Sequence, residues 1–210
     1  WKDIYVMKLE NNEWLTNKSF VLPRPLAYGA SISTEDGIVC IGGCDAEKCY
    51  DDVFIIKWNP ETSTIDIESL PSLPMPLAFM AAAKIGNTIY VAGGQESMHQ
   101  SKPTKTFLSL DLAQKDDPVS FTWKELQPWP GPARILPVAA AQSDGNTDCF
   151  YISSGRKPVA GKTTEILTDG FKYDPLQNKW TVITNVLGKS KGGGDGICVM
   201  AASCIETGSS

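Results

Sequence analysis

One phrase occurs twice in this chain and constrains its fold more than any other feature. Residues 23–43 read PRPLAYGASISTEDGIVCIGG, and residues 74–94 read PMPLAFMAAAKIGNTIYVAGG. Both copies begin with Pro-x-Pro-Leu-Ala, continue through small and apolar residues, and end with a β-rich run and two glycines. A chain with an internal repeat builds one structural unit several times, so the length of the repeat indicates the kind of fold.

The paired glycines mark the length of the repeat. A weaker third copy ends at Ser154 and Gly155, so Gly43, Gly94 and Gly155 lie 51 and 61 residues apart. A period of about 50 residues is typical of the blades of kelch-type propellers. Each unit contains short runs rich in Val, Ile, Tyr and Phe and shows no sustained helical periodicity. We therefore predict an all-β fold, a kelch-type β-propeller built of four-stranded blades.

Three features of the repeat have a physical role in such a blade. Paired glycines permit close backbone approach and positive φ where strands crowd near the propeller axis. Trp123 and Trp180 stand late in their units. We expect them to fill the space between adjacent sheets while the indole N–H finds a partner at the sheet edge. The proline-rich segments LPRP, LPMP and WPGP are expected to cross between blades, where no ladder N–H is needed.

The repeat divides the 210 residues into parts of one propeller. We expect a half blade at residues 1–22, full blades at 23–73 and 74–129, and a nearly complete blade at 130–186. Residues 187–210 would begin another blade. Propellers close with about four to eight blades. About three to four blades form only an arc, so we expect a partial propeller whose remainder is missing from this chain.

Composition argues against two classes of partner. The formal net charge is -5, so the chain has no basic footprint for nucleic acid. It contains no run of about 18 apolar residues, and we expect no membrane insertion.

The six cysteines are too sparse for a disulfide scaffold in a chain of this length. Cys40, Cys44 and Cys49 form a C-x3-C-x4-C pattern, but no fourth ligand has matching spacing, so we expect no metal site. The others are expected to be buried small hydrophobic residues: Cys149, Cys198 and Cys204. The segment KGGGDG at residues 191–196 precedes a strand-like run and lacks a Gly-Lys-Ser/Thr ending, so we expect a turn rather than a phosphate loop.

The course of a propeller blade predicts where functional residues gather. If each unit runs from its inner to its outer strand, the crossing segments and the loops after the glycine pairs meet at one mouth of the central channel. The polar residues expected there are Arg24, Tyr28, Asp45, Glu47, Lys48, Gln95, Glu96, His99, Arg134, Arg156, Lys157 and Glu165. Three arginines at one mouth would suit a ligand that carries a carboxylate, because a guanidinium binds carboxylate bidentately. The alternative is that these are solvated loop charges.

Several segments together resemble one family of kelch propellers. They include PRPLAYGASIS, GIVCIGG, DDVFIIKW, WKELQPWPGPARILPVAAAQ and TTEILTDGFKYDP. This set is similar to the cyclically permuted mutarotases, the family of the sialic-acid mutarotases (N-acetylneuraminate epimerases). The resemblance implies an isomerase that interconverts the anomers of a sialic acid without cofactor or metal. A base would remove the anomeric hydroxyl proton and an acid would protonate the ring oxygen. The partner would be a small-molecule sugar acid.

The resemblance also suggests roles for individual residues. Arg24, Tyr28 and Arg134 match substrate-binding positions of the family, and Arg156 at the presumed mouth is a further candidate. The catalytic acid and base are unassigned, with three weak candidates: Glu96, His99 and Glu165. The Glu–Arg pair of the family has no match here, and we expect it to belong to a blade beyond Ser210, which would leave this chain inactive alone. The second copy has Met75 and Phe79 in place of Arg24 and Tyr28, so we expect it to be scaffold.

The sequence also bears on two other functions of kelch propellers. A copper-radical sugar oxidase needs several His and Tyr ligands, and this chain has one histidine. A non-enzymatic kelch module that binds a protein or a glycan through the same face remains open. The resemblance favours a bacterial periplasmic or exported protein. The exact sugar, the number of blades and the oligomeric state are left open by the sequence.

Overall fold

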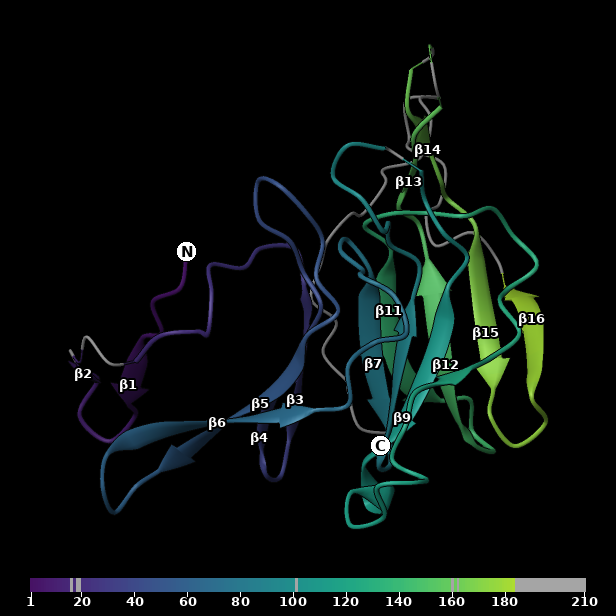
Figure 1. The fold of residues 1–210 in the computed structure, drawn as a ribbon. Helices are drawn as coiled ribbons and strands as arrows, with labels where there is room; N and C mark the ends of the chain where they lie inside the picture. The colour runs from purple at the N-terminus through teal and green to yellow at the C-terminus, as the bar shows by residue number, and fades with distance from the viewer. Residues whose placement is uncertain (16, 18–19, 101, 160, 162, 184–210) are drawn as a thin grey trace.

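The computed structural model describes residues 1–15, 17, 20–100, 102–159, 161 and 163–183. In this part of the chain, three four-stranded antiparallel sheets stand side by side (Figure 1). The first contains β3 (Ala30–Thr34), β4 (Gly37–Ile41), β5 (Val53–Asn59) and β6 (Thr64–Leu70). The second contains β7 (Ala81–Ile85), β8 (Thr88–Ala92), β9 (Phe107–Asp111) and β10 (Lys124–Glu125). The third contains β11 (Val138–Ser143), β12 (Asp148–Ser153), β15 (Gly170–Asp174) and β16 (Lys179–Ile183).

Two short hairpins and one 3-10 turn complete the described structure. Strands β1 (Val6–Lys8) and β2 (Glu13–Leu15) pair near the N-terminus, apart from the three sheets (Figure 1). Strands β13 (Arg156–Lys157) and β14 (Glu165–Ile166) form a hairpin that projects beyond the third sheet. The 3-10 turn η1 (Leu112–Gln114) follows β9.

Each four-stranded sheet pairs its strands in the order in which the chain supplies them. The predicted all-β fold of four-stranded sheets is therefore confirmed. The exact blade boundaries stay a prediction. The turn predicted at 191–196, the strand-like run after it and the start of the next blade at 187–210 lie outside the described residues.

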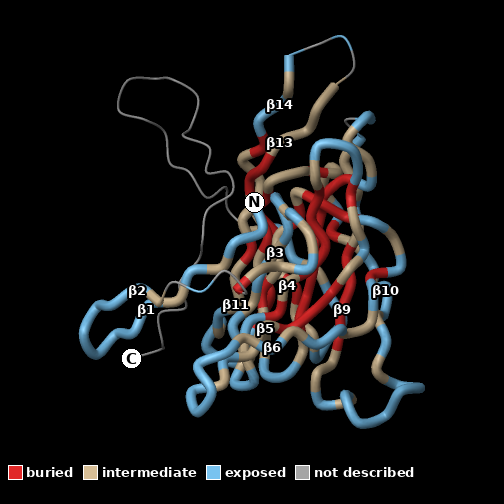
Figure 2. The backbone as a smooth tube through the Cα atoms, turned by 60° about the vertical axis from the view of Figure 1, so that its left-hand side comes forward, coloured by how far each residue is buried: buried red, intermediate tan, exposed pale blue. Residues whose placement is uncertain are grey.

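The core lies between the sheets. Successive side chains of a strand point to opposite faces of its sheet, so a strand in the second sheet packs against both neighbouring sheets. In β8, Ile89 and Val91 join a cluster shared with the first sheet, whereas Tyr90 and Ala92 join one shared with the third. The first cluster is mainly aliphatic: Val39, Ile41, Val53, Ile55, Leu73, Leu77, Met80, Ile89, Val91 and Leu108. The second is rich in aromatic rings: Ala83, Tyr90, Ala92, Phe107, Trp129, Ala139, Phe150, Ile152, Phe171 and Tyr173. Buried residues accordingly concentrate in the sheets, and the β1–β2 hairpin is exposed (Figure 2).

The two predicted filler tryptophans bridge neighbouring sheets as expected. Trp123 packs against the first cluster, and its Nε1 donates to the carbonyl of Pro71 at 2.8 Å. Trp180 packs against the second cluster, and its Nε1 donates to the carbonyl of Gln127 at 2.8 Å. The two predicted roles of these tryptophans are thus confirmed: the ring fills space between sheets, and the indole N–H has a hydrogen-bond partner at the sheet edge.

The crossing segments share an unusual backbone conformation just before each inner strand. Tyr28, Phe79 and Leu136 occupy equivalent positions and have φ of 56, 60 and 52°. Such values are uncommon for residues other than glycine and persist where the surroundings over-determine them. Here, the N–H of Phe79 donates to the carbonyl of Tyr28 at 2.8 Å, and the N–H of Leu136 donates to that of Phe79 at 2.7 Å. One hydrogen bond therefore links each repeat to the next around the inner edge.

The backbone of the next crossing segment lies very close to each of the two glycine pairs, and the second glycine of the pair donates a hydrogen bond to it. Gly43 has φ of 107°, and its N–H donates to the carbonyl of Leu77 at 2.8 Å. Gly94 has φ of 102°, and its N–H donates to the carbonyl of Arg134 at 2.9 Å. A Cβ at Gly93, where φ is 73°, would lie 2.8 Å from that same Arg134 carbonyl oxygen. The predicted close approach and positive φ at the glycine pairs are confirmed.

The substitution Gly93→Ala tests this close approach. We expect it to lower the free energy of unfolding by about 2–4 kcal/mol, because the new Cβ meets backbone as well as an unfavourable φ. Gly86→Ala is the matched control, since φ there is also positive at 54° but nothing lies within 4 Å of the new Cβ. It should lose only about 1–2 kcal/mol. Urea unfolding followed by tryptophan fluorescence measures both, and equal losses would contradict the close-approach argument.

Candidate functional site

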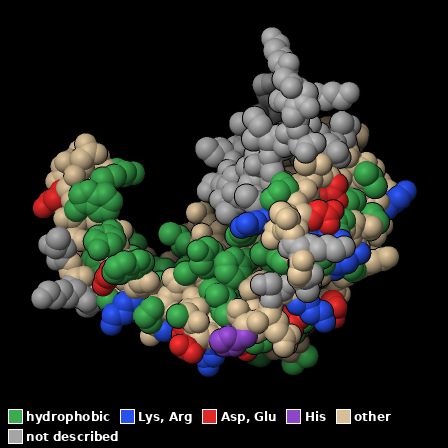
Figure 3. All heavy atoms as spheres, turned by 90° about the horizontal axis from the view of Figure 1, so that it is seen from above, with side chains coloured by type: hydrophobic (Ala, Val, Ile, Leu, Met, Phe, Trp, Pro, Cys, Tyr) green, Lys and Arg blue, Asp and Glu red, His purple; other side chains and the backbone are tan. Residues whose placement is uncertain are grey.

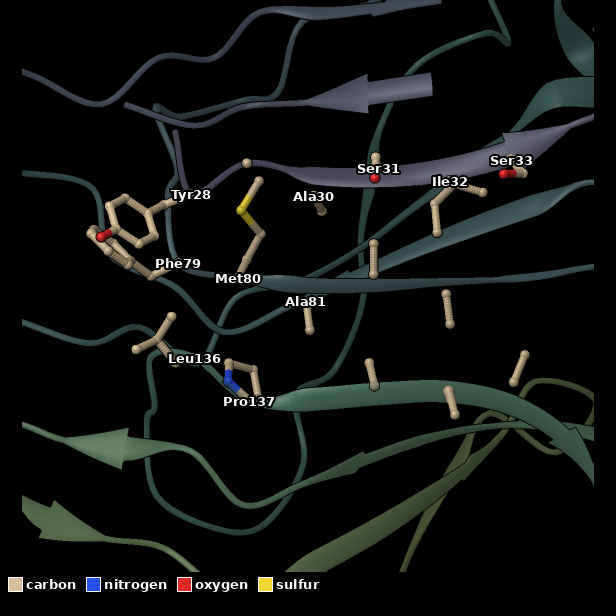
Figure 4. Close-up of a pocket in the computed structure, with 16 residues that line it drawn as sticks. Tyr28, Ala30, Ser31, Ile32, Ser33, Phe79, Met80, Ala81, Leu136 and Pro137 are labelled. Carbon is tan, nitrogen blue, oxygen red and sulfur yellow. The ribbon is translucent and has the colours of Figure 1, made fainter. Parts of the chain in front are cut away.

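The inner strands line a groove of about 640 Å³. Its wall comes from β3, β7 and β11 and from the crossing residues that precede them (Figure 4). Small side chains leave the space open: Ala30, Ala81, Ala82, Ala83, Ala139, Ala140 and Ala141. Within the described part of the chain, the residues that line the groove include no charged side chain. The wall can therefore hold a ligand through apolar faces, hydroxyls and backbone groups.

Two aromatic rings stand at one end of this groove. Tyr28 and Phe79 stack with their ring centroids 4.4 Å apart and an interplanar angle of 29° (Figure 4). Tyr28 is 58% exposed. Leu136 occupies the equivalent position of the third repeat and also lines the groove. The structure thus places Tyr28 at the groove. It also places Phe79 there, although the sequence comparison treated the second copy as scaffold.

Arg24 lies outside the groove. Its Nε is 3.4 Å from Oδ2 of Asp52, and its guanidinium carbon lies 4.4 Å from the ring centre of Tyr50. The hydroxyl of Tyr50 in turn donates to Asp45. Arg24 lines a separate hollow of about 250 Å³ beside β5 and β6. The guanidinium predicted to bind substrate is therefore paired with the carboxylate of its own repeat.

Asp45 is the polar centre of the turn that follows the first glycine pair. Besides the Tyr50 hydroxyl, its Oδ1 accepts the backbone N–H groups of Glu47 and Lys48 at 2.8 and 2.9 Å. The hydrogen bond from Tyr50, followed by these two backbone bonds, lowers the pKa of Asp45 to about 2. The turn thus carries a carboxylate that holds Tyr50, over whose ring the guanidinium of Arg24 lies.

Arg134 is fully buried and its charge is used within the third sheet. Nη2 donates to Oδ2 of Asp169 at 2.8 Å, and Nη1 donates to the carbonyl of Ser154 at 2.8 Å. The guanidinium lies between the rings of Trp129 and Phe171, at 5.5 and 5.4 Å from their centres. We assign Arg134 a structural role on this geometry. A role in substrate binding stays a prediction.

Arg156 lies beside the third wall of the groove, in β13. Its backbone N–H donates to the carbonyl of Ile135 at 2.8 Å, next to the groove residue Leu136. The side chain is half-buried, and its Nε has no hydrogen-bond partner among the residues that the structure describes. Of the three predicted arginines, Arg156 is the one for which no ion pair is seen within the described chain.

The three weak catalytic candidates are exposed and are not joined to one another by any hydrogen bond or ion pair seen among the described residues. Glu96 and His99 stand in the loop after Gly94, where the backbone N–H of His99 donates to Oγ of Ser97 at 3.2 Å. Glu165 in β14 pairs with Lys157 at 3.3 Å. Figure 3 shows the molecule from above, the side on which the β13–β14 hairpin projects in Figure 1. From this side, hydrophobic side chains lie in the hollowed middle of the surface, and many charged side chains lie along its edge.

Sequence reasoning missed the aspartates that hold the arginines. Asp52 and Asp169 occupy the same repeat position, because their carbonyls accept the N–H groups of Gly42 and Ser154 at 2.8 and 3.0 Å. In the second repeat the equivalent residue is Thr106, which accepts from Gly93 at 2.9 Å. Aligning the segments just before each third strand would have revealed an aspartate in the two repeats that carry an arginine.

Among the described residues, no group of three or more His, Cys, Asp or Glu side chains is arranged to hold a metal ion. No helix in the described ranges has the length and hydropathy needed to cross a bilayer.

The chain is similar to curated proteins of two kinds, although no family model matches it. It is 32% identical over 114 residues to the N-acetylneuraminate epimerase of Pasteurella multocida, which covers 54% of this chain and 26% of that protein. A Haemophilus influenzae protein of the same name is 32% identical over 119 residues, covering 57% and 28%. The Aspergillus terreus Kelch-like protein terF is 26% identical over 149 residues, covering 71% and 30%. The matched regions thus span between a quarter and a third of these relatives.

A solved structure, that of YjhT, superposes with a TM-score of 0.69 over 90% of this chain and 64% of its own, at 13% identity. The fold is a kelch-type β-propeller. The predicted resemblance to N-acetylneuraminate epimerases and kelch-repeat proteins is therefore confirmed as sequence similarity. Each four-stranded sheet is one blade of this propeller, so the groove lies along the inner strands β3, β7 and β11 of three successive blades.

The ion pair inside the third blade can be tested by stability. We expect Asp169→Asn to lower the free energy of unfolding by about 3–5 kcal/mol, because it leaves the buried charge of Arg134 without its counter-ion. Glu165→Gln is the control, since it removes an exposed carboxylate paired with Lys157 and should cost less than about 1 kcal/mol. Similar losses in the two variants, measured by urea unfolding, would refute the structural role of Arg134.

Proposed function

We propose that this chain supplies part of the binding wall of a carbohydrate isomerase that interconverts the anomers of a sialic acid, N-acetylneuraminate. The observation that carries the proposal is the 32% identity to two N-acetylneuraminate epimerases over about half of the chain. The solved propeller contributes the fold to this argument and nothing about the substrate.

The groove has properties that suit such a ligand. Its volume of about 640 Å³ falls within the ~300–1,000 Å³ that is usual for small-molecule sites. A sugar ring combines apolar C–H faces with hydroxyls, and the Tyr28–Phe79 stack offers ring faces together with one phenolic hydroxyl. Ser31 and Ser33 add hydroxyls along the wall. These uncharged groups would orient the sugar ring but would not bind the carboxylate of the ligand as an ion pair.

The carboxylate of a sialic acid needs a cation near the groove. Arg24 and Arg134 already face Asp52 and Asp169, whereas Arg156 is half-buried, pairs through its backbone with Ile135, and has no ion pair with a described carboxylate. A guanidinium binds carboxylate through two parallel hydrogen bonds. Arg156 is therefore the residue that we propose for the substrate carboxylate.

Anomer exchange also needs an acid and a base at the anomeric carbon. For this, the described groove wall offers the phenol of Tyr28 and the hydroxyls of Ser31 and Ser33 but no carboxylate, imidazole or amine, and Glu96, His99 and Glu165 stand outside it. We therefore propose that these 210 residues bind and orient the sugar. The proton transfers would then depend on at least one further group outside the described wall.

A second candidate function is a non-enzymatic kelch module that binds a protein or a glycan. The similarity to Kelch-like protein terF favours it, because that match covers 71% of this chain. The two functions differ in what the groove must bind. An isomerase requires affinity for the free monosaccharide, whereas an interaction module presents a broad surface with aromatic anchors.

The binding proposal predicts a charge-specific loss of affinity. We expect Arg156→Gln to weaken N-acetylneuraminate binding about tenfold or more, because one charge-assisted, bidentate contact is removed. Lys157→Gln removes the same charge from the neighbouring residue, which pairs with Glu165, and should leave the affinity nearly unchanged. Ligand-detected NMR titration gives both dissociation constants. Equal effects in the two variants would exclude a specific carboxylate contact.

The isomerase proposal is tested by following the anomers themselves. We expect the 210-residue chain to bind N-acetylneuraminate but to leave its α-to-β conversion at the rate of buffer, measured by proton NMR on freshly released α-anomer. Acceleration by this chain would show that it holds its own acid and base. A longer natural protein that contains these residues should accelerate the conversion, and a rate equal to that of buffer would overturn the isomerase proposal.

A further inference from the structure

Two cysteines face each other across the turn that follows the first glycine pair. Cys44 and Cys49 form an antiparallel β-bridge on either side of residues 45–48. The N–H of Tyr50 donates to the carbonyl of Gly43 at 2.8 Å, and the N–H of Asp45 donates to that of Lys48 at 3.0 Å. These bonds flank the cysteines, which are thus a non-hydrogen-bonded pair.

This geometry matches the requirement for a disulfide. Non-hydrogen-bonded antiparallel pairs bring their Cα atoms to about 4.5 Å, with the two side chains on the same face. Disulfides form at Cα separations of about 4.4–6.8 Å. No backbone rearrangement is needed to bring the two sulfur atoms into bonding range.

The two side chains also share one buried environment. Cys44 and Cys49 are 1% and 5% exposed and form a small cluster with Ala78, against which Phe79 and Met98 pack. We call these five residues the cysteine cluster. Both thiols are free in the structure. Burial, followed by the neighbouring Cys44, raises the pKa of Cys49 to about 11, which is consistent with their proximity.

The other described cysteines lie elsewhere. Cys40 stands in β4 opposite Ser31 and Phe54, and Cys149 stands in β12 of the third sheet. The C-x3-C-x4-C pattern therefore divides into one strand cysteine and one facing pair.

We propose that Cys44 and Cys49 are a dithiol–disulfide pair that closes the turn at residues 45–48. With a low-molecular-weight disulfide such as oxidised glutathione, the Cys49 thiolate attacks one sulfur and releases one glutathione thiolate. The Cys44 thiolate then attacks the Cys49 sulfur of the mixed disulfide and releases the second. The two cysteines lose two protons and two electrons, and the glutathione disulfide gains them as two thiols. This inference does not rest on the proposed isomerase function.

The disulfide would restrain a turn that contacts both polar and groove residues. Asp45 of the turn holds Tyr50, over whose ring Arg24 lies. Phe79 belongs both to the cysteine cluster and to the aromatic stack at the groove. Oxidation would therefore stiffen the support of Phe79 without adding any group to the groove.

The reaction should be slow at neutral pH and faster in alkali. A raised thiol pKa means that the reactive thiolate is scarce near pH 7, and its fraction grows about tenfold per pH unit below that pKa. We expect the rate of oxidation to follow this increase from about pH 7 to pH 9.

Peptide mapping after oxidation gives the decisive test. The folded 210-residue chain is equilibrated with reduced and oxidised glutathione, free thiols are blocked, and trypsin is added. Lys48 separates the two cysteines, so cleavage there leaves a peptide that ends at Lys48 joined to one that begins at Cys49. We expect this linked pair, a mass loss of about 2 Da in the intact chain, and a rise in thermal midpoint of about 5 °C.

Variants assign the bond and exclude misfolding. The link should persist in Cys40→Ser, whose cysteine lies on the same tryptic peptide as Cys44, and should disappear in both Cys44→Ala and Cys49→Ala. Fragmentation of the linked wild-type peptides locates the bonded sulfur independently of any variant. The proposal is overturned if the native chain stays fully reduced, if each thiol carries glutathione separately, or if the link forms only in urea.

Discussion

The N–H of Gly43 donates to the carbonyl of Leu77 in the next repeat, and the N–H of Gly94 donates to the carbonyl of Arg134 in the one after. A second series of bonds joins Tyr28, Phe79 and Leu136 along the inner edge. Both series use backbone atoms alone. They require positive φ and the absence of a Cβ at the glycine pairs, but they place no demand on neighbouring side chains. The spacing of the inner strands, and with it the groove, follows from these bonds.

Because backbone bonds hold the repeats together, the side chains around them can differ from blade to blade. The first and third blades carry an Arg–Asp pair, and the second has Thr106 at the aspartate position. Arg24 remains partly exposed, so its pairing with Asp52 contributes little to stability. Arg134 lies under Trp129 and Phe171, where an unpaired charge would be very costly. An Arg–Asp pair that uses the same aspartate position is therefore peripheral in one blade and essential to packing in another, although Arg24 and Arg134 come from different positions of the crossing segment.

The sequence was sufficient for the fold because the repeat is dictated by local constraints. Glycine pairs, crossing prolines and the edge tryptophans each meet one backbone or packing requirement, and each can be recognised within a single repeat unit. The tryptophans are Trp123 and Trp180. The candidate site was less predictable. A crossing segment has no strand alternation, so nothing in PRPLAY indicates that Tyr28 turns to the groove while Arg24 turns to Asp52. The partner of Arg134 lies 35 residues away, and only superposing the repeats would have drawn attention to Asp169.

The distribution of charge around the groove limits what its wall can do. The stretches of the inner strands that line the groove carry apolar side chains and serine, and the lysine of β7, Lys84, does not line it. Charges are tolerated in the loops and in the β13–β14 hairpin, where water reaches them. A charged group that acts on a ligand in this groove would therefore have to reach in from outside the described wall. Phe79 lies where the two regions meet, since it lines the groove and also packs on Cys44 and Cys49. A disulfide between the two cysteines would accordingly affect the groove first through the position of the Phe79 ring.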